Sequence, residues 1–241
     1  SAASDVYKRQ KPFQLVITSY FLGFGRQMAM GIQVQSATVI LGSQNLVAVL
    51  GIVTAVGSMI SMALCPLLIK KLNERNAYIL LSVYGFAASI FSFAVGHFWF
   101  KNPESTVLTV LFYASLFLIG LQFGAVTLMP MIMTADTVDY YEYETGKRME
   151  GACYSILTLT IKVCLALGTA VGLIFVQKSG YYEALSTGSF TTGTKDIIFF
   201  AYTALPGILA LLSIVPMFKY DIVGEKKANI SNALAARRSA E

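Results

Sequence analysis

The sequence predicts an all-α membrane protein in which six transmembrane helices form one bundle. Hydrophobic residues make up 56% of the 241 residues and charged residues only 13%, whereas about a quarter of a typical soluble domain is charged. The mean hydropathy of +0.64 indicates that the apolar excess extends over most of the chain. A soluble fold of this size could not cover so much apolar surface, so lipid is the expected solvent.

Six continuous apolar stretches have the length that a transmembrane helix needs, about 20 residues. In chain order they are residues 13–40, 46–69, 78–98, 106–133, 152–176 and 197–218. Strands of a membrane barrel alternate between the two faces over about 10 positions, whereas these stretches are continuous. Because lipid offers no hydrogen bonds to the backbone, helices are the expected structure. Gly168 and Gly172 in the fifth stretch predict close packing against a neighbouring helix.

The chain divides into three parts by composition. Residues 11–220 contain the six apolar stretches and form the predicted transmembrane bundle. Residues 1–10 do not continue the first stretch, and we expect them to be a non-native or linker segment. Residues 221–241 are polar and rich in alanine, which predicts a cytoplasmic tail containing a short helix.

Basic residues are concentrated in alternate connections, and cytoplasmic loops of membrane proteins are enriched in Lys and Arg. Most lie before the first stretch, after the second, after the fourth and in the tail: Lys8, Arg9, Lys11, Lys70, Lys71, Arg75, Lys147, Arg148, Lys219, Lys226, Lys227, Arg237 and Arg238. The other connections contain Lys101, Lys178 and Lys195. We therefore expect a multi-pass protein of the inner (plasma) membrane with both termini in the cytoplasm. The positive charge indicates topology, with a weak attraction to anionic membrane lipid, and not nucleic-acid binding.

Arg26 and Lys162 are the basic residues that lie inside the predicted spans. An intramembrane charge costs at least a few kcal/mol and usually faces a bundle interior or an aqueous path. Thr158 precedes Lys162 by four residues and so shares its helix face, and this pair suits coordination of an ion or a sugar hydroxyl. The alternatives are a structural cation paired across helices for Arg26, and a hydroxyl bonded to its own helix for Thr158.

These two cations have no evident carboxylate partner within the spans. The acidic residues lie in connections, tails or span ends, and a buried cation without a counter-charge is unfavourable. We therefore expect the counter-charges to come from helices outside this chain.

An acidic segment, ADTVDYYEYETGKRMEG at residues 135–151, follows the fourth stretch. Asp136, Asp139 and Glu142 are spaced by three residues, so they share a face if the helix continues. Acidic residues at a helix C-terminus oppose the helix dipole, and we expect Lys147 and Arg148 to offset them.

At this segment the sequence resembles the glycoside–pentoside–hexuronide:cation symporters, the melibiose permease-like branch of the major facilitator superfamily. The matching residues are Ala135, Asp136, Val138, Asp139, Tyr140, Glu142, Tyr143, Arg148, Glu150, Tyr154, Ser155, Thr158 and Lys162. The resemblance covers residues 13–220 and implies that the six spans are helices 7–12 of a major facilitator fold. Such a fold has two pseudo-symmetric six-helix halves with the substrate between them, so a missing N-terminal half is an expected partner.

The resemblance also implies roles for individual residues. Lys162 and Thr158 are expected near the cation and sugar site, to which we add Arg26 as the other intramembrane cation. The expected cytoplasmic gate consists of Asp136, Asp139, Glu142, Arg148 and Glu150. The aspartates that coordinate the cation in this family lie on N-terminal helices, so the cation site of this chain is expected to be incomplete.

The leading functional hypothesis is therefore a secondary transporter in which Na⁺ or H⁺ drives the symport of a sugar or glycoside. An alternative is a major facilitator that moves a non-sugar solute, such as a lipid or a drug. A remote alternative is a membrane enzyme that holds a divalent metal on Asp136, Asp139 and Glu142. The sequence lacks the motifs of such enzymes. We expect no enzyme, no bound metal and no cofactor beyond the coupling cation.

Overall fold

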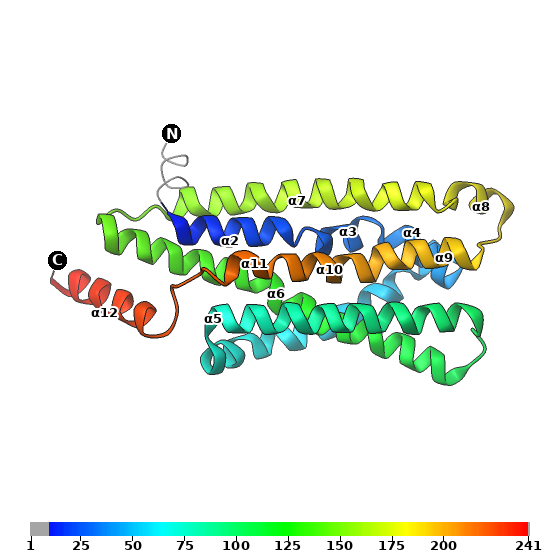
Figure 1. Cartoon of the computed structure of the whole chain (residues 1–241), viewed down its shortest axis with the longest axis horizontal. Helices are drawn as coiled ribbons and strands as arrows, with labels where there is room; N and C mark the ends of the chain where they lie inside the picture. Colours follow the sequence, from blue (N-terminus) through cyan, green and yellow to red (C-terminus); the bar gives the residue numbers. More distant parts are fainter. Residues whose placement is uncertain (1–9, 241) are drawn as a thin grey trace.

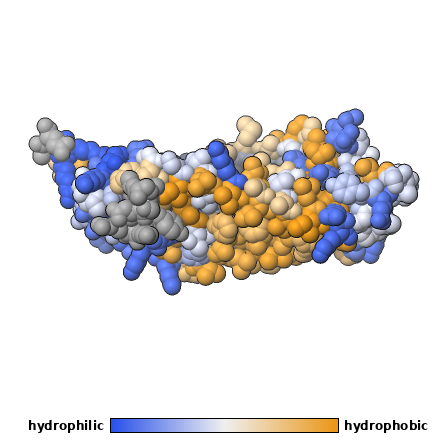
Figure 2. All heavy atoms as spheres, turned by 90° about the horizontal axis from the view of Figure 1, so that it is seen from above, coloured by the Kyte–Doolittle hydropathy of each residue, from blue (hydrophilic) through white to orange (hydrophobic). Residues whose placement is uncertain are grey.

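The computed structural model describes residues 10–240, which are helical almost throughout and contain no strand. Figure 1 shows long helices running side by side along the length of the molecule. On the face shown in Figure 2, hydrophobic residues cover the middle and hydrophilic residues lie at the two ends. This distribution matches a bundle that crosses lipid and exposes its ends to water, and it confirms the predicted all-α membrane fold.

The first predicted span is a broken helix rather than a continuous one. It consists of α2 (Lys11–Leu22), α3 (Gly25–Gly31) and α4 (Gln33–Leu41). A Cβ on Gly25 would lie 2.8 Å from the Cα of Pro206, so only a glycine lets the chain approach the last span this closely. Glycines also weaken a helix interior, and this explains why the break falls near Gly23 and Gly25.

The second and third predicted spans are the two arms of α5 (Val47–Lys101), which follows the short 3₁₀ helix Gln44–Leu46. A straight helix of 55 residues would be about 80 Å long, far more than a bilayer core of about 30 Å. Asn73 has a φ of 64°, and its non-helical backbone separates two helices. Figure 1 shows α5 turning back on itself. The Asn73 side chain accepts a hydrogen bond of 3.0 Å from the backbone N–H of Asn76, which caps the second arm.

The fourth and fifth spans are long continuous helices, α6 (Thr106–Thr145) and α7 (Glu150–Lys178). Ser105 caps the start of α6, and Gly146 ends it in a left-handed conformation with φ 69°. The short helix α8 (Tyr181–Thr187) follows α7 at the opposite end of the molecule.

The last span changes its helical type along its length. It contains α9 (Thr192–Phe199), the π-helical turn η2 (Phe200–Ala204), α10 (Leu205–Leu212) and α11 (Ile214–Met217). Pro206 lacks a backbone N–H and cannot complete the regular α-helical ladder, which favours a wider turn just before it. The tail helix α12 (Gly224–Ala240) then packs against the end of α6.

Four helical segments of the described chain are individually long and apolar enough to cross a membrane: Gln44–Lys101, Thr106–Thr145, Glu150–Lys178 and Thr192–Met217. The first of these holds two spans because α5 reverses at Asn73. The interrupted helices α2 to α4 cover the first predicted stretch but are not among these four segments, because each of them is short. The six predicted stretches therefore all fall on helical segments of the bundle.

The two ends of the bundle differ in charge. The start of α2, the turn of α5, the α6–α7 connection and α12 lie at one end, whereas α8 and the α5–α6 connection lie at the other (Figure 1). The basic residues of the sequence fall in the same two groups, with Lys70, Arg75 and Arg148 at the end where α12 lies.

Small residues allow close contacts between the helices. A Cβ on Gly120 of α6 would lie 2.3 Å from the carbonyl oxygen of Thr54 in the first arm of α5. Gly168 and Gly172 of α7 face α3, where a Cβ on Gly168 would lie 2.7 Å from the backbone nitrogen of Met28. The packing predicted for these two glycines is therefore confirmed.

Candidate functional site

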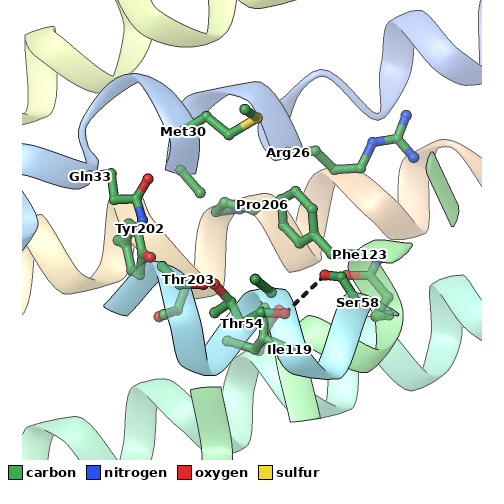
Figure 3. A pocket seen from close by; sticks show the side chains of 15 residues that line it. Arg26, Met30, Gln33, Thr54, Ser58, Ile119, Phe123, Tyr202, Thr203 and Pro206 are labelled. Carbon is green, nitrogen blue, oxygen red and sulfur yellow. Dashed lines mark hydrogen bonds between the residues drawn. The ribbon is translucent and has the colours of Figure 1, made fainter. Parts of the chain in front are cut away.

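A half-open cavity of about 250 Å³ lies between α3, α4, both arms of α5, α6 and the last span. Figure 3 shows side chains from these elements converging on it. Its lining is mixed, with apolar groups such as Met30, Ile119 and Phe123 beside these polar ones: Arg26, Gln33, Thr54, Ser58, Ser89, Gln122, Tyr202 and Thr203. Hydroxyl and amide groups of this kind can hydrogen-bond a polyhydroxylated solute.

The cavity coincides with irregular backbone in two of the spans. The α3–α4 junction at Ile32 lies on one side, and the π-helical turn Phe200–Ala204 lies on the other. Broken helices at membrane depth are tolerated where they line a cavity, and many transporters bind their substrate at such places. No local sequence pattern predicts this cavity, although Gly23 and Gly25 are a sign of irregularity in the first span.

Arg26 is buried at the edge of this cavity, with only 4% of its surface exposed. Its guanidinium carbon lies 4.7 Å from the centre of the Tyr20 ring, a cation–π contact. Within residues 10–240 its Nη2 atom has no hydrogen-bond partner and no carboxylate forms an ion pair with it. The positive charge is therefore compensated only in part by the residues that the structure describes.

Lys162 and Thr158 lie together on one face of α7, as their spacing predicted, but outside this cavity. They line a separate shallow hollow with Tyr154 and Ser155. Both side chains are exposed on the surface of the chain, and neither has an ion-pair or hydrogen-bond partner in the described part. Ser155 instead donates a hydrogen bond of 2.6 Å to the carbonyl of Gly151 in its own helix. Arg26 and Lys162 thus belong to two different hollows.

Arg148 forms ion pairs with three of the predicted gate residues near the end of α6 and the start of α7. Its guanidinium lies 2.7 Å from the Glu142 carboxylate, 3.0 Å from Asp139 and 3.1 Å from Glu150. Hydrogen bonds to Glu142 and Asp139 raise the pKa of Arg148 further above its ordinary value. The expected offset of the helix dipole is therefore provided by Arg148, whereas Lys147 forms no ion pair with the described residues.

Asp136 belongs to a different cluster from the other predicted gate residues. It is 8% exposed and lies 2.7 Å from the ammonium group of Lys227 in α12. The same ammonium lies 2.5 Å from the carboxylate of Glu74, at the turn of α5. Sequence reasoning missed Glu74 and Lys227 because they are 153 residues apart and no local pattern joins them.

Comparison with known proteins identifies the family of this chain. Residues 3–224 match the family model described as "MFS/sugar transport protein". The chain belongs to this family. The family is one of transporters and not of enzymes, and it agrees with the resemblance found at residues 135–162.

Individual relatives are similar to the chain at lower identity. A "Putative sulfoquinovose importer" of Escherichia coli is 27% identical over 205 residues, covering 82% of this chain and 40% of the relative. An "Uncharacterized symporter YnaJ" of Bacillus subtilis is 23% identical and covers 97% of this chain and 48% of the relative. A "Glucuronide carrier protein homolog" of Escherichia coli is 25% identical over 71% of this chain and 35% of the relative. The chain thus spans less than half the length of these relatives.

Proposed function

We propose that this chain is the C-terminal six-helix half of a symporter that uses Na⁺ or H⁺ to import a sugar or glycoside across the inner (plasma) membrane. The observation that supports this most strongly is Lys162, a cation in the middle of the apolar helix α7 without an acidic partner in residues 10–240. A charge at this depth requires compensation. A second six-helix half that carries acidic side chains would provide it.

In this proposal the face of α7 that carries Lys162 and Thr158 looks toward the missing half. The ammonium would hold carboxylates of that half when the cation site is empty, and an incoming cation would compete for the same carboxylates. Thr158 would offer its hydroxyl to the cation or the sugar. This arrangement couples occupancy of the cation site to the position of the two halves.

The gate function proposed for the acidic end of α6 follows from its geometry. Arg148, Asp139 and Glu142 form a network at the same end of the bundle as α12. The concentration of Lys and Arg at this end supports a cytoplasmic location in this proposal. Exposed ion pairs are individually weak. They can therefore be exchanged for pairs with charged groups of the second half as the two halves rock about a central site.

A sugar or glycoside is the substrate class that the available observations favour. Two relatives are named for sugar derivatives, sulfoquinovose and glucuronide. The hydroxyl and amide groups around the half-open cavity also suit a polyhydroxylated ligand. A non-sugar solute remains the alternative, and an apolar lipid or drug would make less use of this polar lining.

The proposed function is tested by uptake into vesicles that contain the full-length protein. A panel of labelled sugars, glycosides and sugar acids would be offered with and without an inward Na⁺ or H⁺ gradient. We expect one member of the panel to accumulate against its own gradient only when the cation gradient is present. Transport of lipids or drugs, with no sugar uptake under either gradient, would support the alternative.

A further inference from the structure

The tail helix α12 is docked onto the bundle by an apolar face. Ile230 and Leu234 are 5% and 2% exposed and belong to the same packed cluster as Met133 of α6 and Tyr220. α12 packs against the end of α6, at the end of the bundle where α5 reverses (Figure 1). A helix that buries part of its surface in this way is held in a defined position.

Beneath α12 lie two acidic side chains that are almost completely buried. Glu74 of the α5 turn and Asp136 of α6 are 5% and 8% exposed. The ammonium of Lys227 lies 2.5 Å from the Glu74 carboxylate and 2.7 Å from that of Asp136. The neighbouring Arg75 instead donates to the carbonyl oxygen of Tyr220. Lys227 is therefore the cation that compensates both acids in the described part of the chain.

The charge state of Lys227 fits this role. Burial lowers its pKa, but the hydrogen bonds to Asp136 and Glu74 outweigh that effect and raise the pKa above its ordinary value. Removing the ammonium would leave two carboxylates close together in a poorly solvated place, where like charges repel strongly.

A second set of contacts connects α12 with the Arg148 network. Arg238 donates hydrogen bonds of 2.9 and 3.1 Å to the Glu142 carboxylate, which Arg148 also binds. Arg237 donates to the Tyr143 carbonyl and lies over its ring. α12 thus contacts the turn of α5 at Glu74, and α6 at both Asp136 and the acidic residues near its end.

We propose that α12 is a strap on the cytoplasmic gate and that Lys227 is its positioning residue, which fixes the end of α6 against the turn of α5. This inference rests on the proposed transporter function for its effect on transport. The docking itself does not depend on that function. By fixing the end of α6, this contact also determines the positions from which the Asp139 and Glu142 carboxylates bind Arg148.

The test compares Lys227→Met with Lys226→Met in the full-length protein. Lys226 is a matched control because it is the adjacent lysine and pairs with Asp221, an acid outside the buried pair. Hydrogen exchange of the α12 amides is measured first. We expect Lys227→Met to speed their exchange roughly tenfold or more, the loss expected for hydrogen bonds to a charged group, and Lys226→Met to leave it almost unchanged.

A rescue experiment distinguishes charge compensation from simple loss of packing. In a Glu74→Gln/Asp136→Asn background the buried acids are neutral, so adding Lys227→Met should no longer accelerate exchange. Equal exchange rates in Lys227→Met and Lys226→Met, or acceleration that persists in the neutral background, would overturn the proposal.

Transport kinetics then test the positioning role. Because Lys227 lies far from the middle of the membrane, its substitution should reduce the maximal uptake rate several-fold while the half-saturating substrate concentration changes little. Faster exchange with unchanged uptake would show that α12 is only a structural appendage. If no solute is transported by the unaltered protein, the transporter assignment fails while the exchange result still decides the docking.

Discussion

The basic residues of the proposed site and gate differ in how many carboxylates compensate their charge. Arg148 has three carboxylates within hydrogen-bond distance, whereas Lys162 and Arg26 have none within residues 10–240. A protein of this size cannot leave two cations uncompensated at membrane depth without cost. The residues with missing partners are therefore the best places to look for substrate, cation and partner contacts.

At this scale we predict that Lys162→Ala abolishes concentrative uptake by the full-length protein. Without the ammonium, the opposing carboxylates lose the group that competes with the coupling cation, so the internal substrate concentration should no longer exceed the external one. The measurement is accumulation of labelled substrate under a cation gradient. Lys178→Ala, at the end of the same helix, should accumulate substrate normally, and the prediction fails if both variants do.

The elements are held together by close backbone contacts at glycines. α7 lies against α3 where Gly168 and Gly172 leave no room for a side chain. α6 lies against the first arm of α5 in the same way, with Gly120 and Gly124 next to backbone carbonyls. These contacts determine how near the cavity-lining residues of different helices lie to one another.

We predict that Gly168→Leu destabilises the bundle by about 1–3 kcal/mol, since a larger side chain would push α7 away from Met28. The midpoint of thermal unfolding in detergent measures this change. Ala166→Leu, an exposed position on the same helix, introduces the same side chain without the clash. A similar loss of stability in both variants would mean that the interhelical contact is not responsible.

The Arg148 network leads to a second prediction for elements. Arg148→Gln should favour the open cytoplasmic state by about 1 kcal/mol, the scale of an exposed charge network. The readout is the rate at which a maleimide applied from the cytoplasmic side labels Ser155→Cys, on the α7 face that carries Lys162. Lys147→Gln is the adjacent control because Lys147 has no ion pair with the described residues. Labelling rates that do not differ would remove Arg148 from the gate.

At the scale of the whole molecule, the described residues expose a large apolar surface, as the proposed half of a larger bundle would. Large apolar side chains are exposed along the first arm of α5 and along α7, for example Met59 at 71% and Leu159 at 62%. Lipid or a second bundle must cover this surface. The part of this surface near Lys162 and Thr158 is more polar, and covering it with lipid would be energetically unfavourable.

We predict that residues 11–241 alone insert into membranes but do not transport, because the proposed half-transporter would contain only one side of the site. Reconstituted vesicles with this fragment should show no sugar uptake above empty vesicles. Supplying an N-terminal half as a separate chain should restore cation-dependent uptake. Saturable uptake by the fragment alone would contradict the half-transporter proposal.

Much of this architecture could be determined from the sequence because lipid imposes a simple rule. Apolar stretches of about 20 residues must be helical in lipid, so the helical class and the positions of the six helical stretches followed from local composition. The packing of Gly168 and Gly172 and the pairing of Arg148 with Glu142 also depend on residues close in sequence or on small side chains visible in it. The family followed from an ordered motif over residues 135–162.

Only the tertiary structure decided which groups meet across long separations. The break in the first span depends on the approach of Gly25 to Pro206, and the cavity forms where that break faces the π-helical turn of the last span. Asp136 pairs with Lys227, 91 residues away, instead of joining Asp139 and Glu142. Local patterns specify helices and their polar faces. The partner of a buried charge depends on how distant helices pack, and this information is spread over the whole chain.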